Sequence, residues 1–136
     1  MLLGGRAVGA SFAGIQAAAQ WTPRGGLEAY PGLLARSCGG ATSYKSDDVR
    51  KETAARLLAR KDIITVLESG DNRLNLRLRL SHAQRDAITQ DAKGDALDAV
   101  LCLMQAAWGL VQHVSGAPCF GLPSTVDPLE GWIVTA

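Results

Sequence analysis

Two aspartates, Asp95 and Asp98, stand three residues apart at the start of a long apolar stretch. If that stretch is a helix, both carboxylates lie on one face of its first turn, where they repel each other unless a cation or a donor compensates. Paired carboxylates of this kind suit a hard divalent cation such as magnesium. Helix capping is the simpler explanation of the same residues, with Asp95 as the N-cap and Asp98 favoured by the helix dipole. The pattern alone leaves both interpretations open.

A third candidate acid, Glu28, lies in the short segment 27–30, which predicts a strand that Pro31 ends. A carboxylate in a short strand just before a proline turn is either a solvent-facing residue or a site residue. The residues themselves do not decide between these two roles.

The stretch 94–108 predicts the helix that positions the two aspartates. After Asp98 no Asp, Glu, Lys or Arg follows before the expected end of the helix near His113 or Ser115. Nearly every face of such a helix must meet protein, so we expect it at the centre of the core.

The remaining segments predict helices mixed with short strands. Amphipathic spacing predicts helices over 10–20, 49–60 and 82–90, and we expect Asp47 or Asp48 to cap the second and Ser81 the third. The charged residues of 49–60, Arg60 among them, are expected to face water. Strands are predicted over 27–30, 73–80 and 130–134, whereas the β-branched run 63–67 is typical of a strand or of a continuing helix.

Residues 73–80 alternate strictly between leucines and polar residues. This period of two predicts a strand with the leucines on its buried side. The exposed side would carry Arg73, Arg77 and Arg79, which suits an ordinary solvated sheet face and could also reach phosphates.

Length and composition are those of one globular domain of 136 residues. The formal net charge of +1 excludes a broadly basic surface, so any contact with nucleic acid would be local. The three cysteines are widely spaced, which predicts neither a zinc site nor a disulfide framework and favours a reducing, cytoplasmic location. We expect no membrane span and no signal peptide.

Four segments, in this order, resemble a bacterial family of predicted nucleases, the domain of unknown function number 429. The resemblance extends over about residues 10–134. The matching pieces are Glu28-Ala29-Tyr30-Pro31, Ser43-Tyr44-Lys45 with Arg50 following, Gly94 to Ala99 with the apolar helix behind it, and Glu130-Gly131-Trp132-Ile133.

The resemblance implies an α/β, ribonuclease H-like fold, with a mixed sheet and a buried central helix near residues 95–114. It also implies a site in which Glu28, Asp95 and Asp98 hold two magnesium or manganese ions. Those ions would orient a water for in-line attack on a phosphodiester. Lys45 would balance charge nearby or touch phosphate.

The superfamily's first metal ligand is an aspartate on the first strand, and no aspartate precedes Asp47 here. We therefore expect residues 1–136 to form a single domain that lacks the family's N-terminal part, or to meet that part on another polypeptide. A missing hairpin would leave an open sheet edge, which predicts a homodimer or a complementary N-terminal fragment as partner.

The function that these features predict is a metal-dependent nuclease-like domain acting on nucleic acid, inactive alone if the first-strand aspartate is absent. The alternative is a non-catalytic binding or interaction module of the same fold.

Overall fold

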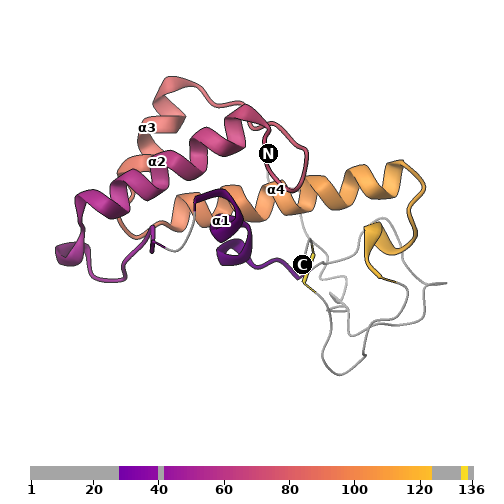
Figure 1. The fold of residues 1–136 in the computed structure, drawn as a ribbon, viewed down its shortest axis with the longest axis horizontal. Coiled ribbons are helices and arrows are strands. Elements are labelled where there is room, and N and C mark those ends of the chain that lie inside the picture. Colours follow the sequence, from indigo (N-terminus) through magenta and orange to yellow (C-terminus); the bar gives the residue numbers. More distant parts are fainter. Residues whose placement is uncertain (1–27, 40–41, 124–132, 135–136) are drawn as a thin grey trace, which may run out of the picture.

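The computed structural model describes residues 28–39, 42–123 and 133–134, and this part of the chain is helical (Figure 1). Its elements, in chain order, are α1 (Pro31–Gly39), the 3₁₀ turn η2 (Val49–Lys51), α2 (Ala54–Ser69), α3 (His82–Gln90), α4 (Asp95–Val114) and the 3₁₀ turn η3 (Pro118–Gly121). The described residues contain no strand. The prediction of an α/β fold with a mixed sheet is therefore wrong for the part of the chain that can be described.

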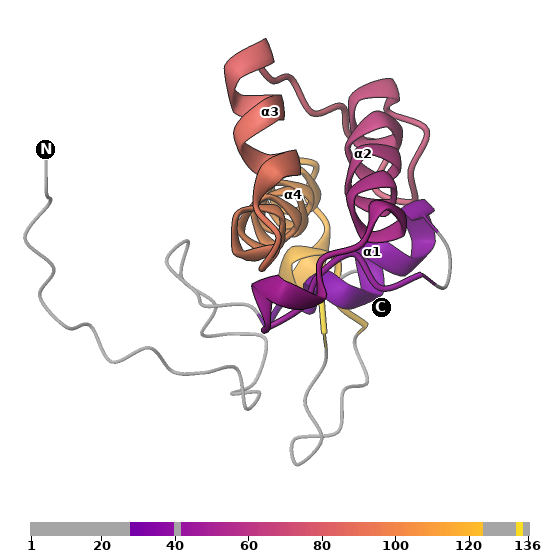
Figure 2. The same ribbon diagram turned by 90° about the vertical axis from the view of Figure 1, so that its left-hand side faces the viewer.

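Helix α4 is the longest element and runs along the long axis of the molecule (Figure 1). Figure 2 looks down this axis and shows α3 and α2 standing side by side, with α4 beneath α3 and α1 beneath α2. Helix α1 contacts both α2 and α4, and α3 contacts the same two helices. The core between them consists of the following buried residues: Leu34, Ala35, Tyr44, Ala59, Ile63, Ile64, Leu67, Leu74, Ile88, Leu97, Leu101 and Met104.

The central helix lies where the sequence predicts it, but its cap differs. The N-cap is Gly94, which has φ +77° and no side chain, so Asp95 is already the first helical residue. Asp91 supplies the missing acceptor, because its Oδ2 accepts a hydrogen bond of 2.8 Å from the backbone N–H of Ala96. The interpretation of Asp95 as an N-cap is therefore wrong.

The β-branched run 63–67 continues a helix. Helix α2 begins after Thr53, whose hydroxyl accepts a hydrogen bond of 3.3 Å from the N–H of Arg56, so the helix starts later than the predicted cap at Asp47 or Asp48. Ile63, Ile64 and Leu67 lie on the inner side of α2 and are at most 2% exposed. Packing of these side chains outweighs their preference for strands.

The alternation in residues 73–80 correctly predicts which side chains are buried. It wrongly predicts that the backbone pairs with another strand. Leu74 is buried and the other leucines are half-buried, whereas Arg73, Arg77 and Arg79 are exposed. The segment begins with a turn at Arg73 and Leu74 and continues without regular structure, and Asn75 has a left-handed backbone with φ +52°. The N–H of Leu78 donates to the carbonyl of Leu67 near the end of α2, over 2.9 Å, and not to another strand. It therefore covers the end of a helix.

The segments predicted as outer strands are only partly described. Residues 28–30 are irregular and lead into α1, in which Pro31 is the first residue. The N–H of Val134 donates to the carbonyl of Glu28 over 2.9 Å, which joins the two segments at one point. The predicted helix over 10–20, and residues 130–132 of the predicted last strand, lie outside the described residues. The helix predicted over 82–90 is confirmed, with Ser81 and Gln84 forming a capping box.

Candidate functional site

Asp98 lies at the centre of a polar cluster at the start of α4. The hydroxyl of Tyr44 donates a hydrogen bond to its Oδ1, and the ammonium of Lys45 donates to its Oδ2. The side chain of Asp98 is 22% exposed and that of Lys45 is 43% exposed, so the ion pair sits at the edge of the protein with one side toward solvent. Two of the residues predicted for the site, Lys45 and Asp98, are thus brought together.

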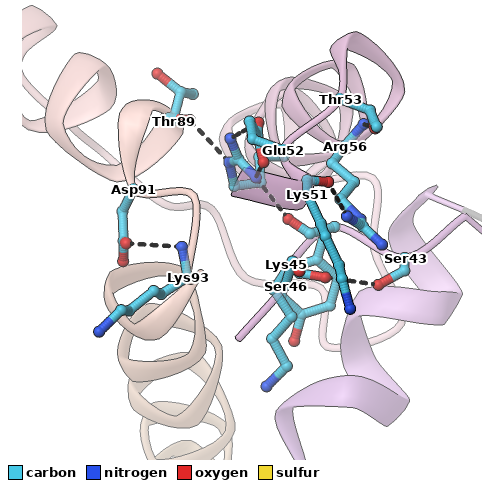
Figure 3. Close-up of polar contacts among 12 residues, drawn as sticks. Ser43, Lys45, Ser46, Lys51, Glu52, Thr53, Arg56, Thr89, Asp91 and Lys93 are labelled. Atoms are coloured by element: carbon cyan, nitrogen blue, oxygen red, sulfur yellow. Dashed lines mark hydrogen bonds and ion pairs between the residues drawn. The ribbon is translucent and has the colours of Figure 1, made fainter. Parts of the chain in front are cut away.

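The loop that carries Tyr44 and Lys45 has one backbone hydrogen bond to the turn before α4 and one side-chain hydrogen bond within itself. The N–H of Ser46 donates to the carbonyl of Ala92 over 3.3 Å, and the hydroxyl of Ser43 donates to the carbonyl of Lys45 over 2.9 Å. Figure 3 shows the Ser43–Lys45 contact and the facing turn, where the N–H of Lys93 donates to Asp91. A side chain at Gly94 would fill this junction, because its Cβ would come within 2.7 Å of the Cβ of Lys45.

Arg60 supports the same loop from inside. Its guanidinium is 1% exposed and donates to the carbonyls of Tyr44 (2.7 Å) and Thr89 (2.8 Å) and to Oε1 of Glu52 (2.6 Å). Two of these partners, Glu52 and Thr89, are labelled in Figure 3. The prediction that Arg60 faces water is therefore wrong, since the fork of its guanidinium joins α2, the end of α3 and the Tyr44 loop.

The contacts with Asp98 favour the neutral hydroxyl of Tyr44 and the charged ammonium of Lys45. Burial, followed by the hydrogen bond to Asp98, raises the pKa of Tyr44, so its hydroxyl stays neutral. The hydrogen bond to Asp98 raises the pKa of Lys45, so its ammonium stays charged. Burial and then the charge of Asp98 raise the pKa of the Cys102 thiol, one turn further along α4. None of these shifts prepares a base or a nucleophile, because each one favours the form that the group already has.

The donor set does not fit the two-ion centre that the family resemblance implies. Asp95 and Glu28 are both exposed, and the described residues contain no group of three or more His, Cys, Asp or Glu side chains that could hold a metal ion. Both oxygens of Asp98 already accept from protein donors. Asp95 acts on Lys45 only as a weaker, more distant charge. The contact of Glu28 with Val134 is made by its backbone carbonyl, which accepts a hydrogen bond from the N–H of Val134.

Three residues in and around the polar cluster have roles that the sequence analysis did not predict: Tyr44, Arg60 and Asp91. Tyr44 is adjacent to Lys45 in a segment of the family resemblance, so its place in the site could have been predicted from the sequence. The role of Arg60 could not be predicted, because its buried guanidinium contacts residues 16 and 29 positions away. Asp91 accepts from the N–H groups of Lys93 and Ala96, two and five residues on, so its position just before the helix was a local signal.

The other unusual feature of α4 is its apolar surface on the side away from the core. Leu103 is 62% exposed, Leu110 59% and Val114 77%. With the exposed alanines at 99 and 106, these residues follow one another at intervals of three and four and therefore share one side of the helix. We call this set the outer face: Ala99, Leu103, Ala106, Leu110 and Val114. Figure 1 shows that the C-terminal half of α4 extends beyond α2 and α3.

By length and composition alone, α4 could cross a membrane, which departs from the expectation that no stretch could. This is weak evidence for a span, since the core helix of a soluble protein meets the same criteria. The buried side of α4 is occupied by the domain itself, because Leu97, Leu101 and Gln105 are each 0% exposed.

Comparisons with protein-family models, with curated proteins and with solved structures give no match, so the resemblance to the nuclease family remains a prediction that no relative tests.

Proposed function

We propose that the chain is a non-catalytic interaction module that binds an amphipathic helix along the outer face of α4. The observation that carries this proposal is the exposure of Leu103, Leu110 and Val114, on one side of a helix that has no Asp, Glu, Lys or Arg after Asp98. Scattered exposed leucines are ordinary, whereas an aligned set on one helix is typical of a binding surface.

Leu103 and Leu110 are the two leucines of the outer face, and covering them stabilises a complex. Full burial of a leucine side chain is worth roughly 1.5–3 kcal/mol, and Leu103 and Leu110 are more than half exposed in the described structure. A partner that covers them gains most of that free energy. An amphipathic helix is the partner that fits best, because its own apolar residues repeat at the same intervals of three and four.

The polar cluster supports the non-catalytic part of the proposal. Asp98 is already neutralised by Lys45 and hydrogen-bonded by Tyr44, which is how a carboxylate that holds a loop in place is arranged. Metal-dependent hydrolysis would require the opposite, oxygens that are free to accept a cation.

Nucleic acid, the partner that the family resemblance implies, stays a prediction. Arg73, Arg77 and Arg79 are exposed, but the guanidinium of Arg77 already donates to the carbonyl of Glu68 over 2.8 Å. The expected cytoplasmic location and the reading as a single domain stay predictions as well.

The test uses the full chain and a synthetic helical peptide of leucine and lysine with the leucines on one face. Amide NMR signals of residues 99–114 should shift on addition of this peptide. A peptide of the same composition in scrambled order is the control and should produce no shift. The double variant Leu103→Gln/Leu110→Gln should fold as before and lose the response, since both side chains lie outside the core. Shifts that persist in the variant, or that map elsewhere, would contradict the proposal.

A second arm tests the non-catalytic part directly. We expect the melting temperature to be the same with and without magnesium or manganese, in the wild type and in Asp98→Asn. Metal-dependent stabilisation that the substitution removes would instead support the nuclease prediction, because a ligand that binds only the folded state raises its stability.

A further inference from the structure

We infer that the helix which covers the outer face of α4 is α4 of a second copy of this chain, running antiparallel, with a two-fold axis between Ala106 and Ala107. The inference rests on the proposed function and names its partner. A two-fold interface uses the same patch on both copies, so the patch must complement itself.

The spacing of the outer face meets this requirement. A two-fold axis between residues 106 and 107 places Leu103 opposite Leu110 of the other copy, and Ala99 opposite Val114. Large side chains at 103 and 110 therefore pack on both sides of a centre made of alanines. Small residues at the crossing point allow two helix backbones to approach closely, while leucines on either side fill the space between them.

Charge favours the antiparallel direction. Asp95 is an exposed carboxylate in the first turn of α4, where Asp98 is paired with Lys45, and no Asp, Glu, Lys or Arg follows before the helix ends. A parallel pair would bring the acidic starts of two helices together and align their dipoles. An antiparallel pair separates the acidic ends and opposes the dipoles, so it avoids both repulsions.

The size of the patch indicates a weak dimer. The largest apolar patch on a monomer is on the order of 300–600 Å², and the outer face is one side of a single helix. A standard interface buries roughly 800 Å² per partner. We therefore expect a dimer that dissociates at micromolar concentrations rather than a permanent one.

A lipid surface is the other chemistry that an apolar helix face could meet. The opposite side of α4 is committed to the core, with Leu97, Leu101 and Gln105 fully buried, so α4 would have to leave the domain to span a membrane. Shallow adsorption through the outer face is the remaining membrane outcome, and the experiment below separates it from a dimer.

The experiment is sedimentation equilibrium of the full chain over a wide range of concentrations, with charge variants at two exposed positions. Ala99→Glu alone and Val114→Lys alone should each weaken the dimer at least about tenfold, because each places an unpaired charge in an apolar contact. The combined Ala99→Glu/Val114→Lys chain should regain most of the lost affinity, since residue 99 of one copy faces residue 114 of the other. Within one helix these positions are too far apart to pair, at about 1.5 Å of rise per residue.

A wild-type chain that is a monomer at every concentration would overturn the inference, and so would a combined variant weaker than both single ones. Binding of the leucine–lysine peptide, measured on the same samples, separates this failure from that of the proposed function, because peptide binding by a monomer leaves the proposed function standing. Binding of the wild type, but not the combined variant, to phosphatidylcholine vesicles in the absence of a dimer would replace the second copy by a membrane.

Discussion

The two sides of α4 carry the same kind of side chain in opposite surroundings. Leu97 and Leu101 are 0% exposed and form the centre of the core, while Leu103 and Leu110 on the other side are 62% and 59% exposed. The composition of α4 predicts that nearly every side of the helix is buried. In the described part of the chain, only one side is buried. In the function we propose, the buried side of α4 stabilises the fold and the exposed side binds a partner.

The largest difference between the buried and exposed sides of α4 is expected when one leucine on each side is truncated. Leu101→Ala should lower the free energy of unfolding by roughly 3–4 kcal/mol, because it removes buried methyl groups and leaves a cavity. Leu103→Ala should change it by no more than about 0.5 kcal/mol at concentrations where the chain is monomeric. Urea denaturation measures both. Equal losses would mean that the outer face is covered within the monomer.

The same contrast exists on α2, between the neighbouring cations Arg60 and Lys61. Arg60→Met should cost about 3 kcal/mol, because it leaves the buried carbonyls of Tyr44 and Thr89 without their donor and Glu52 without its cation. Lys61→Met, at an exposed position, should stay within about 0.5 kcal/mol. Thermal unfolding of the pair distinguishes the two. A small effect at Arg60 would show that the guanidinium does not anchor the Tyr44 loop.

Two glycines with left-handed backbones sharpen the comparison between the start and the end of α4. Gly94→Ala should cost about 2 kcal/mol, since the new Cβ is strained at φ +77° and overlaps the Cβ of Lys45 at 2.7 Å. Gly116→Ala, at φ +84° with nothing within 4 Å, carries the backbone strain alone and should cost about 1 kcal/mol. Denaturant midpoints of the two variants give the difference. A Gly94 variant that is no less stable than the Gly116 variant would place the Lys45 loop elsewhere.

The smallest expected effect is on pH dependence. The folded-state pKa values of Tyr44 and Lys45 are both raised above their ordinary values of 10.0 and 10.5. Groups of this kind contribute stability that is fully present below those values and lost as the pH rises through the folded-state values. The wild type should therefore lose stability above about pH 10 more steeply than Asp98→Asn, which removes the charge that raises the pKa of Lys45 and that adds to the effect of burial on the pKa of Tyr44. Melting temperatures that fall in parallel for the wild type and Asp98→Asn over this pH range would contradict a contribution of Asp98 to the two pKa shifts.

Much of α4 and its surroundings could be predicted from the sequence. The apolar run placed the central helix and its end, and Ser81 marked the start of α3. The resemblance put Lys45 near Asp98, and the two form an ion pair. These features depend on local patterning or on a single contact between neighbouring elements.

The sheet could not be predicted reliably, for a physical reason seen in residues 73–80. A period of two predicts that alternate side chains are buried, and Leu74 is indeed buried while Arg77 is exposed. It does not report whether the backbone pairs with a strand or, as at Leu78, with the end of a helix. The role of Arg60 was likewise inaccessible, because only the folded chain brings the carbonyls of Tyr44 and Thr89 within reach of its guanidinium.

The most direct measurement is the amide NMR spectrum of the full chain, recorded on dilution and then on addition of magnesium. Our account predicts that signals from residues 99–114 move on dilution, and that those of Glu28, Asp95 and Asp98 stay unchanged with the metal. Signals that move at the three acids on adding magnesium, with none moving on dilution, would contradict the claim that α4 acts through its apolar side.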